Sequence, residues 1–124
     1  MIIGIGADLC EISRMAALLS DTAFLKRFFD EAEQAYILSK GVYAAASMAG
    51  CFAAKEAFAK ALGSGFYGIK PEEVVILHGE NGAPYFDLQG GAMAAASTKG
   101  VRSSHLSITH EAGIALAFAV LEGN

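Results

Sequence analysis

Cysteine, proline and tryptophan are scarce in this chain. The scarcity of cysteine is the most informative, because it limits disulfide bonds and metal sites. The 124 residues include two cysteines, two prolines and no tryptophan. Cys10 and Cys51 are too few for a disulfide framework, and no metal-ligand spacing joins them. We therefore expect two reduced thiols, as in proteins of the cytoplasm.

The sequence also lacks a long run of strongly apolar residues. The uncharged stretch 41–54 consists mostly of Ala, Gly and Ser and ends at Lys55. A membrane-spanning helix needs about 20 apolar residues. The first residues carry no basic side chain, and the charged residue Asp8 lies too near the start of the chain for the apolar stretch of a signal peptide. We expect neither a membrane span nor a signal peptide.

Positive charge is in the minority. Nine Lys and Arg residues stand against thirteen Asp and Glu, which gives a net charge of −4. This balance argues against general nucleic-acid binding, which needs a basic surface. The charges are more nearly even in residues 1–60, so the sequence is compatible with a local basic patch there for an acidic partner.

Hydrophobic residues, by contrast, make up 54% of the chain. A chain of this length forms one domain, here residues 1–124, with a core of modest size. The apolar content exceeds what such a core can hide. This excess favours a homo-oligomer.

Hydrophobic periodicity and turn residues divide the chain into short elements. The pattern predicts strands at residues 2–9, 74–78, 84–88, 105–109 and 113–121. It predicts helices at residues 11–19, 22–29, 30–39, 42–62 and 90–99. Asp30 and Glu33 have the spacing of a capping box at the start of the third helix. Because hairpins and helices are segregated, we expect a single α+β domain in which an antiparallel sheet packs against one long helix.

The helix predicted at residues 42–62 carries the strongest chemical signal. Glu56 lies between Lys55 and Lys60, and Lys60 follows it by one turn, so both side chains project from one face. Asp8 ends an apolar strand, where an isolated charge is costly unless it is paired or bound to a metal. Two simpler interpretations stay open. Asp8 could cap the following helix, and Glu56 with Lys60 could be an exposed ion pair worth about 0.3–0.5 kcal/mol.

Strand alternation places His105, Ser107 and Thr109 on one side of the strand predicted at residues 105–109. Such a polar stripe could bind a ligand or be the solvent face of an edge strand. Zinc is not expected, because no cysteine lies nearby to complete a ligand set. The glycines at positions 4 and 6 lack the third glycine of a dinucleotide-binding loop, and no P-loop is present.

The order of these motifs along the chain resembles that of the holo-acyl-carrier-protein synthase family, which are small 4′-phosphopantetheinyl transferases. The matching segments are Gly6-Ala7-Asp8 followed by Arg14, the run from Phe52 to Gly63, Asn81-Gly82-Ala83-Pro84-Tyr85, and His105-Leu106-Ser107-Ile108-Thr109-His110. The resemblance extends from Ile3 to about Leu121. It implies the fold of that family, in which an antiparallel sheet packs against a long helix.

The resemblance also implies an activity. Members of the family transfer 4′-phosphopantetheine from coenzyme A to a serine of an apo acyl carrier protein, a step in fatty acid biosynthesis. They depend on Mg²⁺ and release 3′,5′-ADP. Members of this length are typically homotrimers whose sites lie between neighbouring subunits.

By resemblance, the catalytic residues are Asp8, Glu56 and Lys60. Asp8 and Glu56 would hold Mg²⁺, which prefers hard oxygen ligands, and Lys60 would bind a phosphate as a point charge. Either carboxylate, or a metal-held water, could accept the serine proton. Coenzyme A would be contacted by Lys60, Gly63, His105, Ser107 and Thr109.

The partner protein in this family is acidic. By resemblance, Arg14 would contact the carrier, and Lys26 and Arg27 would widen the basic patch that steers it toward the site. The alternative for Arg14 is a solvated residue on the first helix.

The chain departs from the family pattern at Cys51, where an arginine is usual, and at Ala83, where a lysine is common. The missing arginine would help to hold a ligand phosphate, a contact worth roughly 1.5–3 kcal/mol. Lys40, Lys99 or Arg102 could take its place. The departure keeps open a non-catalytic relative that binds carrier protein or coenzyme A, and an unrelated ligand-binding protein is a third hypothesis.

Overall fold

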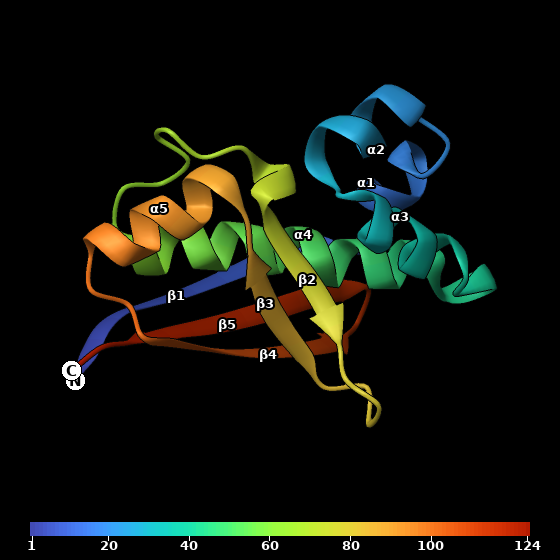
Figure 1. Cartoon of the computed structure of the whole chain (residues 1–124). Helices are drawn as coiled ribbons and strands as arrows, with labels where there is room; N and C mark the ends of the chain where they lie inside the picture. Colours follow the sequence, from blue (N-terminus) through green and yellow to red (C-terminus); the bar gives the residue numbers. More distant parts are fainter.

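A long helix lying across a three-stranded antiparallel sheet forms the frame of the molecule (Figure 1). The computed structural model describes all of residues 1–124. The strand order is β1 (Ile2–Glu11), β5 (Ile114–Glu122) and β4 (Ser103–Glu111). Helix α4 (Ala44–Leu62) covers one face of this sheet, and the two chain ends lie side by side at one end of it.

Helix α4 is built from residues that suit a buried helix. Alanine is its commonest residue and has the highest helix propensity. The helix ends at Gly63, whose φ of 87° is the left-handed conformation that glycine tolerates. The predicted helix over residues 42–62 is wrong at its start, where a 3₁₀ turn, η1 (Gly41–Tyr43), comes first. The backbone of Tyr43, with φ −96° and ψ 6°, lies outside the α-helical region, so α4 begins at the next residue, Ala44.

Three short helices follow β1 and gather near one end of α4 (Figure 1). They are α1 (Ile12–Leu18), α2 (Thr22–Phe28) and α3 (Glu31–Leu38). The predicted capping box of α3 is confirmed: Glu33 accepts a hydrogen bond from the N–H of Asp30 at 3.0 Å, and the Asp30 carboxylate accepts from the N–H of Ala32 at 2.9 Å.

A separate two-stranded sheet packs against α4 and β4 (Figure 1). Its strands are β2 (Val74–His78) and β3 (Pro84–Leu88), which have the bounds predicted from the sequence. The 3₁₀ turn η2 (Pro71–Glu73) leads into this hairpin, and helix α5 (Gly90–Thr98) follows it. The α+β class with antiparallel pairing is confirmed, although the strands divide into two sheets.

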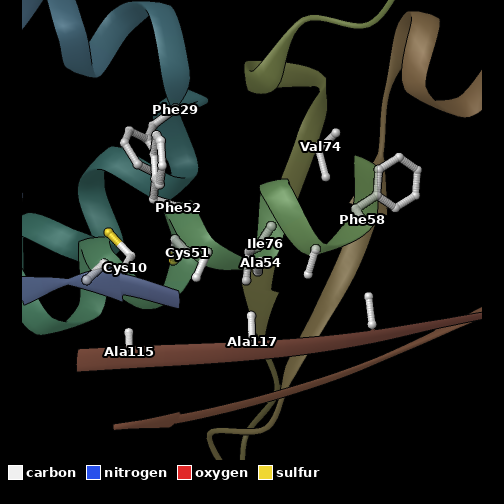
Figure 2. Close-up of a cluster of buried hydrophobic side chains, with 14 of the residues drawn as sticks. Cys10, Phe29, Cys51, Phe52, Ala54, Phe58, Val74, Ile76, Ala115 and Ala117 are labelled. Atoms are coloured by element: carbon white, nitrogen blue, oxygen red, sulfur yellow. The ribbon is translucent and has the colours of Figure 1, made fainter. Parts of the chain in front are cut away.

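The core lies between α4 and the sheet face beneath it (Figure 2). The sheet side is lined by the small, fully buried side chains of Ala115, Ala117 and Ala119. Phe58 of α4 is also fully buried and packs against Phe86 of β3, with 5.4 Å between ring centroids. Burial of one such aromatic side chain stabilises the fold by about 1.5–3 kcal/mol.

Helix α4 lies closer to β1 than a side chain at Gly4 or Gly6 would allow. A Cβ atom added at Gly4 would collide with the carbonyl oxygen of Ala61, and one added at Gly6 would collide with that of Ala57. Both positions therefore need glycine on steric grounds. The contact places β1 beside the second half of α4, where Lys60 lies.

The other face of the three-stranded sheet is apolar and exposed. Its side chains alternate with those that point toward α4. We call this surface the apolar sheet face; its large members are Ile5, Leu9, Ile114, Leu116 and Phe118. Leu9 is 63% exposed and Phe118 is 43% exposed, which is unusual for apolar residues that are neighbours on one sheet.

No single helix is long enough and apolar enough to cross a membrane. Only α3 and the η1–α4 stretch reach that length and composition together, as a pair bent by 120°.

Candidate active site

Lys60 joins Asp8 to helix α4. Its Nζ donates to Oδ1 of Asp8 at 3.1 Å and to the backbone oxygen of Ala7 at 3.0 Å. The two charged residues are 52 positions apart and meet because β1 passes close to the helix. The capping interpretation of Asp8 is wrong, because the N-cap of α1 is Glu11 and no side chain caps that helix.

Glu56 lies within electrostatic reach of Asp8. Partial burial, and then the negative charge of Asp8, raise the pKa of the Glu56 carboxyl, while Lys60 and Arg14 act to lower it. Two carboxylates held in this way either share a proton or attract a cation. The interpretation as an isolated Glu56–Lys60 ion pair is wrong, because the Lys60 ammonium is paired with Asp8.

Arg14 reaches the same region from α1. Its guanidinium lies over the ring of Phe52, 5.0 Å from the centroid, and this stacking holds it beside the site. Its positive charge also acts on Cys10, although burial is the larger effect and raises the pKa of that thiol. Arg14 is exposed and contacts the Phe52 ring, so its role in binding the carrier stays a prediction.

Asp8 and Glu56 suit a hard divalent cation such as Mg²⁺. No three His, Cys, Asp or Glu side chains gather into a metal site. A site with two carboxylates needs further oxygen atoms from water or a phosphate ligand, which is an arrangement that Mg²⁺ commonly takes. Lys60 and Arg14 add positive charge at the border, so the whole cluster suits a phosphate group bound beside a metal.

His105, Ser107 and Thr109 do not join this cluster within the chain. They lie on the outward side of β4, the side shared with the apolar sheet face, whereas Asp8 points toward α4. The Nε2 atom of His105 lies 3.0 Å from Oε1 of Glu122, and this contact holds the pKa of Glu122 below its usual value. A role for these three residues in binding coenzyme A stays a prediction.

Gly63 lies one turn beyond Lys60, at the exposed end of α4. Its backbone N–H is already used, because it bonds to the carbonyl oxygens of Ala59 and Lys60. A contact between Gly63 and coenzyme A also stays a prediction.

Lys26 and Arg27 of α2 border a surface hollow together with Lys70. The neighbouring Phe28 packs on Phe52, with 5.8 Å between ring centroids. Because Arg14 lies over the same Phe52 ring, the basic residues of α2 and Arg14 occupy adjoining surfaces.

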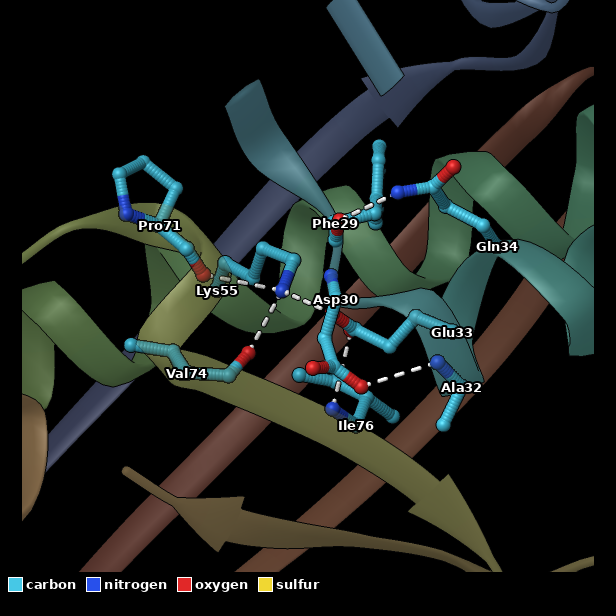
Figure 3. Close-up of polar contacts among 9 residues, drawn as sticks. All are labelled: Phe29, Asp30, Ala32, Glu33, Gln34, Lys55, Pro71, Val74 and Ile76. Carbon is cyan, nitrogen blue, oxygen red and sulfur yellow. Dashed lines mark hydrogen bonds and ion pairs between the residues drawn. The ribbon is translucent and has the colours of Figure 1, made fainter. Parts of the chain in front are cut away.

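Lys55 has a buried partner, Glu33, that sequence patterns do not reveal (Figure 3). Nζ of Lys55 donates to Oε1 of Glu33 at 2.8 Å and to the backbone oxygens of Pro71 and Val74 at 3.0 and 2.6 Å. Oε2 of Glu33 accepts from the N–H of Ile76 at 3.0 Å. Burial raises the pKa of Glu33 and lowers that of Lys55, whereas the ion pair acts in the opposite direction on both. The network fixes α4 against α3 and β2.

Cys51 lies near this network and is only 1% exposed. Burial raises the pKa of its thiol to about 12, so the group stays protonated at neutral pH and is a poor nucleophile. The position where the family usually carries an arginine therefore faces the core in this chain.

A cavity of about 410 Å³ lies on the other flank of α4. It is bordered by α3, η1, α4, the β2–β3 turn and β4, and its basic residues are Lys40, His78 and His110. Burial, and then the charge of Lys40, lower the pKa of His78. The Nε2 atom of His110 lies 2.9 Å from the backbone oxygen of Ala46. The position of His110 could be inferred from the sequence, because strand alternation places its side chain on the face of β4 opposite to His105.

Known proteins of similar sequence come from one superfamily. The sequence matches the 4′-phosphopantetheinyl transferase superfamily over residues 4–119. It is similar to a holo-[acyl-carrier-protein] synthase of Treponema denticola, with 46% identity over 123 residues, 99% of this chain and 100% of that protein. It is also similar to the holo-[acyl-carrier-protein] synthase of Trichlorobacter lovleyi, with 43% identity and 98% of each chain covered.

Solved structures of such synthases share the fold. The Neisseria meningitidis enzyme has a TM-score of 0.89 at 33% identity, with 98% of this chain and 99% of that chain covered. The Helicobacter pylori enzyme in complex with coenzyme A has a TM-score of 0.81 at 30% identity, with 95% and 99% covered. The Bacillus anthracis enzyme in complex with CoA (3′,5′-ADP) has a TM-score of 0.82 at 31% identity, with 100% and 99% covered. The sequence and the fold together show that the chain belongs to the holo-[acyl-carrier-protein] synthases of the 4′-phosphopantetheinyl transferase superfamily.

Proposed function

We propose that this synthase transfers 4′-phosphopantetheine from coenzyme A to a serine of an acyl carrier protein in the cytoplasm, with Mg²⁺ as its metal and 3′,5′-ADP as the second product. The observation that carries the proposal is the convergence of Asp8 and Glu56 beside the ammonium of Lys60. Two of the similar solved structures contain coenzyme A or its 3′,5′-ADP part. Free, buried cysteines are typical of a reducing compartment.

Each residue of the cluster has a separate role. Asp8 and Glu56 would hold Mg²⁺ through carboxylate oxygens, and a bound ion would supply positive charge next to the diphosphate. Lys60, already directed at Asp8, binds a phosphate oxygen at the same point. The serine oxygen bonds to phosphorus as the 3′,5′-ADP oxygen leaves, and a carboxylate or an adjacent water accepts the serine proton.

We infer that the protein forms a homo-oligomer through the apolar sheet face. Register places Ala7 beside Phe118 and Leu9 beside Leu116, so the apolar side chains are contiguous across two strands. A surface of this kind is rarely left in contact with water. A trimer, as is typical of the family, would cover it and bring His105 close to a neighbouring subunit.

The proposed subunit arrangement also bears on the site. Asp8 belongs to β1 and His110 to β4, and these strands are the opposite edges of the three-stranded sheet. The carboxylate pair and the 410 Å³ cavity thus open on different flanks of one chain. A coenzyme A molecule that uses both would bridge two subunits.

The carrier protein would dock on α1 and α2. Arg14 stands beside the carboxylate pair, and Lys26 and Arg27 continue the basic surface away from it. Positive charge at the edge of the site attracts an acidic partner and orients it before contact. The carrier serine would then enter next to Asp8 and Glu56.

Intact-protein mass spectrometry tests the proposal. Incubation with coenzyme A, Mg²⁺ and an apo carrier should add the mass of phosphopantetheine to the carrier. Glu56→Gln should nearly abolish transfer with its circular dichroism unchanged, and Glu31→Gln, on an exposed helix position, is the matched control and should stay active. No mass gain with several carriers and metals would overturn the proposal. Tight binding without turnover would identify a non-catalytic relative.

A further inference from the structure

A surface hollow of about 550 Å³ lies between helix α2 and the segment that leads into η2. Lys26 and Arg27 border it from α2, where they follow Ala23 by three and four positions and so share a face with it. Lys70 borders it from the segment before η2. The chain has only nine lysine and arginine residues, so three of them at one hollow concentrate positive charge there. We call this surface, defined by Lys26, Arg27 and Lys70, the basic hollow.

The three cations of the basic hollow are not neutralised within the chain. The ion pairs of the molecule involve Lys55, Lys60 and His105 instead. Glu72 is the single carboxylate at the hollow, so positive groups outnumber negative ones by three to one. Like charges held close together repel one another, and an anionic partner removes that repulsion.

Lys70 is held in place through its main chain. Its N–H donates to Oε1 of Glu73 at 2.9 Å, and Oε2 of the same carboxylate accepts from the N–H of Gly91 at 3.0 Å. The preceding residue, Ile69, is buried. The backbone of Lys70 is thus fixed while its side chain is exposed, which lowers the entropy cost of presenting its charge to a partner.

A row of aromatic and basic side chains connects the basic hollow to the proposed active site. The Arg27 guanidinium lies 5.6 Å from the centroid of the Phe28 ring. Phe28 packs on Phe52, and the Arg14 guanidinium lies over the other ring. Positive charge therefore continues from the basic hollow along α2 to the edge of the carboxylate pair.

We propose that Lys70, together with Lys26, forms a second docking point for the carrier protein and binds carboxylates on a helix of the carrier. The inference rests on the proposed function, because it takes an acidic carrier as the partner. It adds a contact from outside the helices that hold the other proposed carrier contacts.

A second docking point would act on orientation more than on affinity. Each exposed ion pair adds little binding free energy, but charges at separate places on a surface fix how the partner lies on it. Arg14 alone would leave the carrier free to turn about one contact. With Lys70 engaged as well, the carrier serine is directed at the active site.

Steady-state transfer kinetics test the docking point. Lys70→Glu reverses the charge and should raise the KM for the apo carrier about tenfold, with kcat and the KM for coenzyme A unchanged. Glu72→Gln removes the one carboxylate that repels an acidic partner and should lower the same KM about twofold. Lys99→Glu is the matched control: it makes the same change in net charge at an exposed position outside the hollow, and the KM for the carrier should not change.

A binding measurement separates docking from catalysis. With an apo carrier whose acceptor serine is replaced by alanine, Lys70→Glu should associate about tenfold more slowly than the wild-type protein and should depend less on salt concentration. Changing acidic residues of the carrier to lysine one at a time should restore binding to Lys70→Glu at one position, which identifies the partner carboxylate.

Three results would overturn the docking point: an unchanged KM for the carrier in Lys70→Glu, a rise no larger than that in Lys99→Glu, or an equal rise in the KM for coenzyme A. Absence of transfer by the wild-type protein would overturn the proposed function instead. The binding of the carrier to the wild-type protein and to Lys70→Glu would still decide whether the docking point exists.

Discussion

Nζ of Lys60 donates to Oδ1 of Asp8 at 3.1 Å, and this ion pair joins the first strand to the long helix. The Lys60 side chain is 57% exposed, so the pair contributes little to folding, at most about 1 kcal/mol. Its position beside the carboxylates suits a role in binding phosphate, and the first prediction separates these two roles.

Lys60→Met should lower kcat/KM for coenzyme A by about 10²-fold, because the charge that meets the phosphate is lost. The midpoint of urea unfolding should change little. Lys60→Arg should recover part of the activity, since it restores the charge with a different shape. A large loss of stability in Lys60→Met together with unchanged kcat/KM would show that the residue is structural.

Asp8→Asn should lower the pKa of Glu56, because the charge of Asp8 is one of the two causes that raise it. Titration of the Glu56 carboxyl carbon by NMR measures the shift. An unchanged pKa would mean that the two carboxylates do not interact.

The same shift affects stability. A carboxyl whose pKa is raised on folding binds its proton more tightly in the folded state, so its contribution is present below pH 4.5 and is lost as the pH rises through the folded pKa. Asp8→Asn should therefore reduce the loss of unfolding free energy above pH 4.5, measured by urea unfolding at several pH values.

Lys55→Met should destabilise the fold by about 3–5 kcal/mol, because it leaves the buried Glu33 carboxylate without its ammonium partner. The double variant Glu33→Leu/Lys55→Met should recover most of that loss, since an apolar pair can replace a buried ion pair. Urea unfolding of the single and double variants gives the coupling energy. Additive losses would contradict the pairing.

Gly6→Ala should destabilise the protein by about 1–3 kcal/mol and lower transfer activity, because its Cβ would push β1 away from the backbone of Ala57. Gly79→Ala is the matched control, since its Cβ would make an ordinary contact of 3.4 Å with Asn81. Thermal unfolding and the transfer assay should both distinguish the two variants. Similar behaviour of both would mean that the helix tolerates a wider spacing.

Phe118→Glu should dissociate the proposed oligomer, because it puts a charge in the middle of the apolar sheet face. Sedimentation velocity gives the mass of the wild-type and variant particles. Glu72→Gln lies away from this face and should leave the mass unchanged. A wild-type protein that sediments as a monomer would contradict the proposed oligomer.

The parts of the fold that follow from local chemistry could be predicted from the sequence. The turn between β2 and β3, the capping box of Asp30 and Glu33, and the end of α4 at Gly63 each depend on a few adjacent residues. The division of the strands into two sheets depends on contacts between distant segments, which periodicity does not describe.

In the candidate site too, the sequence indicates local features but not the contacts between distant segments. The sequence singled out Asp8, Glu56 and Lys60, because charged side chains next to apolar or alanine-rich surroundings stand out. It could not show that Lys60 is paired with Asp8 rather than with Glu56, since that choice depends on how closely β1 approaches α4. The sequence identifies Glu33 only as part of a cap, although its carboxylate also binds Lys55, 22 positions away.

The contact of Gly4 and Gly6 with the carbonyl oxygens of α4 sets the distance between the strand that carries Asp8 and the helix that carries Glu56. The gap between strand and helix at this point is set by main-chain atoms, which every variant of the chain retains. Any side chain larger than glycine at either position would move the strand that carries Asp8 away from the helix that carries Glu56. Two hydrogen atoms, in place of two methyl groups, thus set how closely β1 and α4 approach each other at the proposed site.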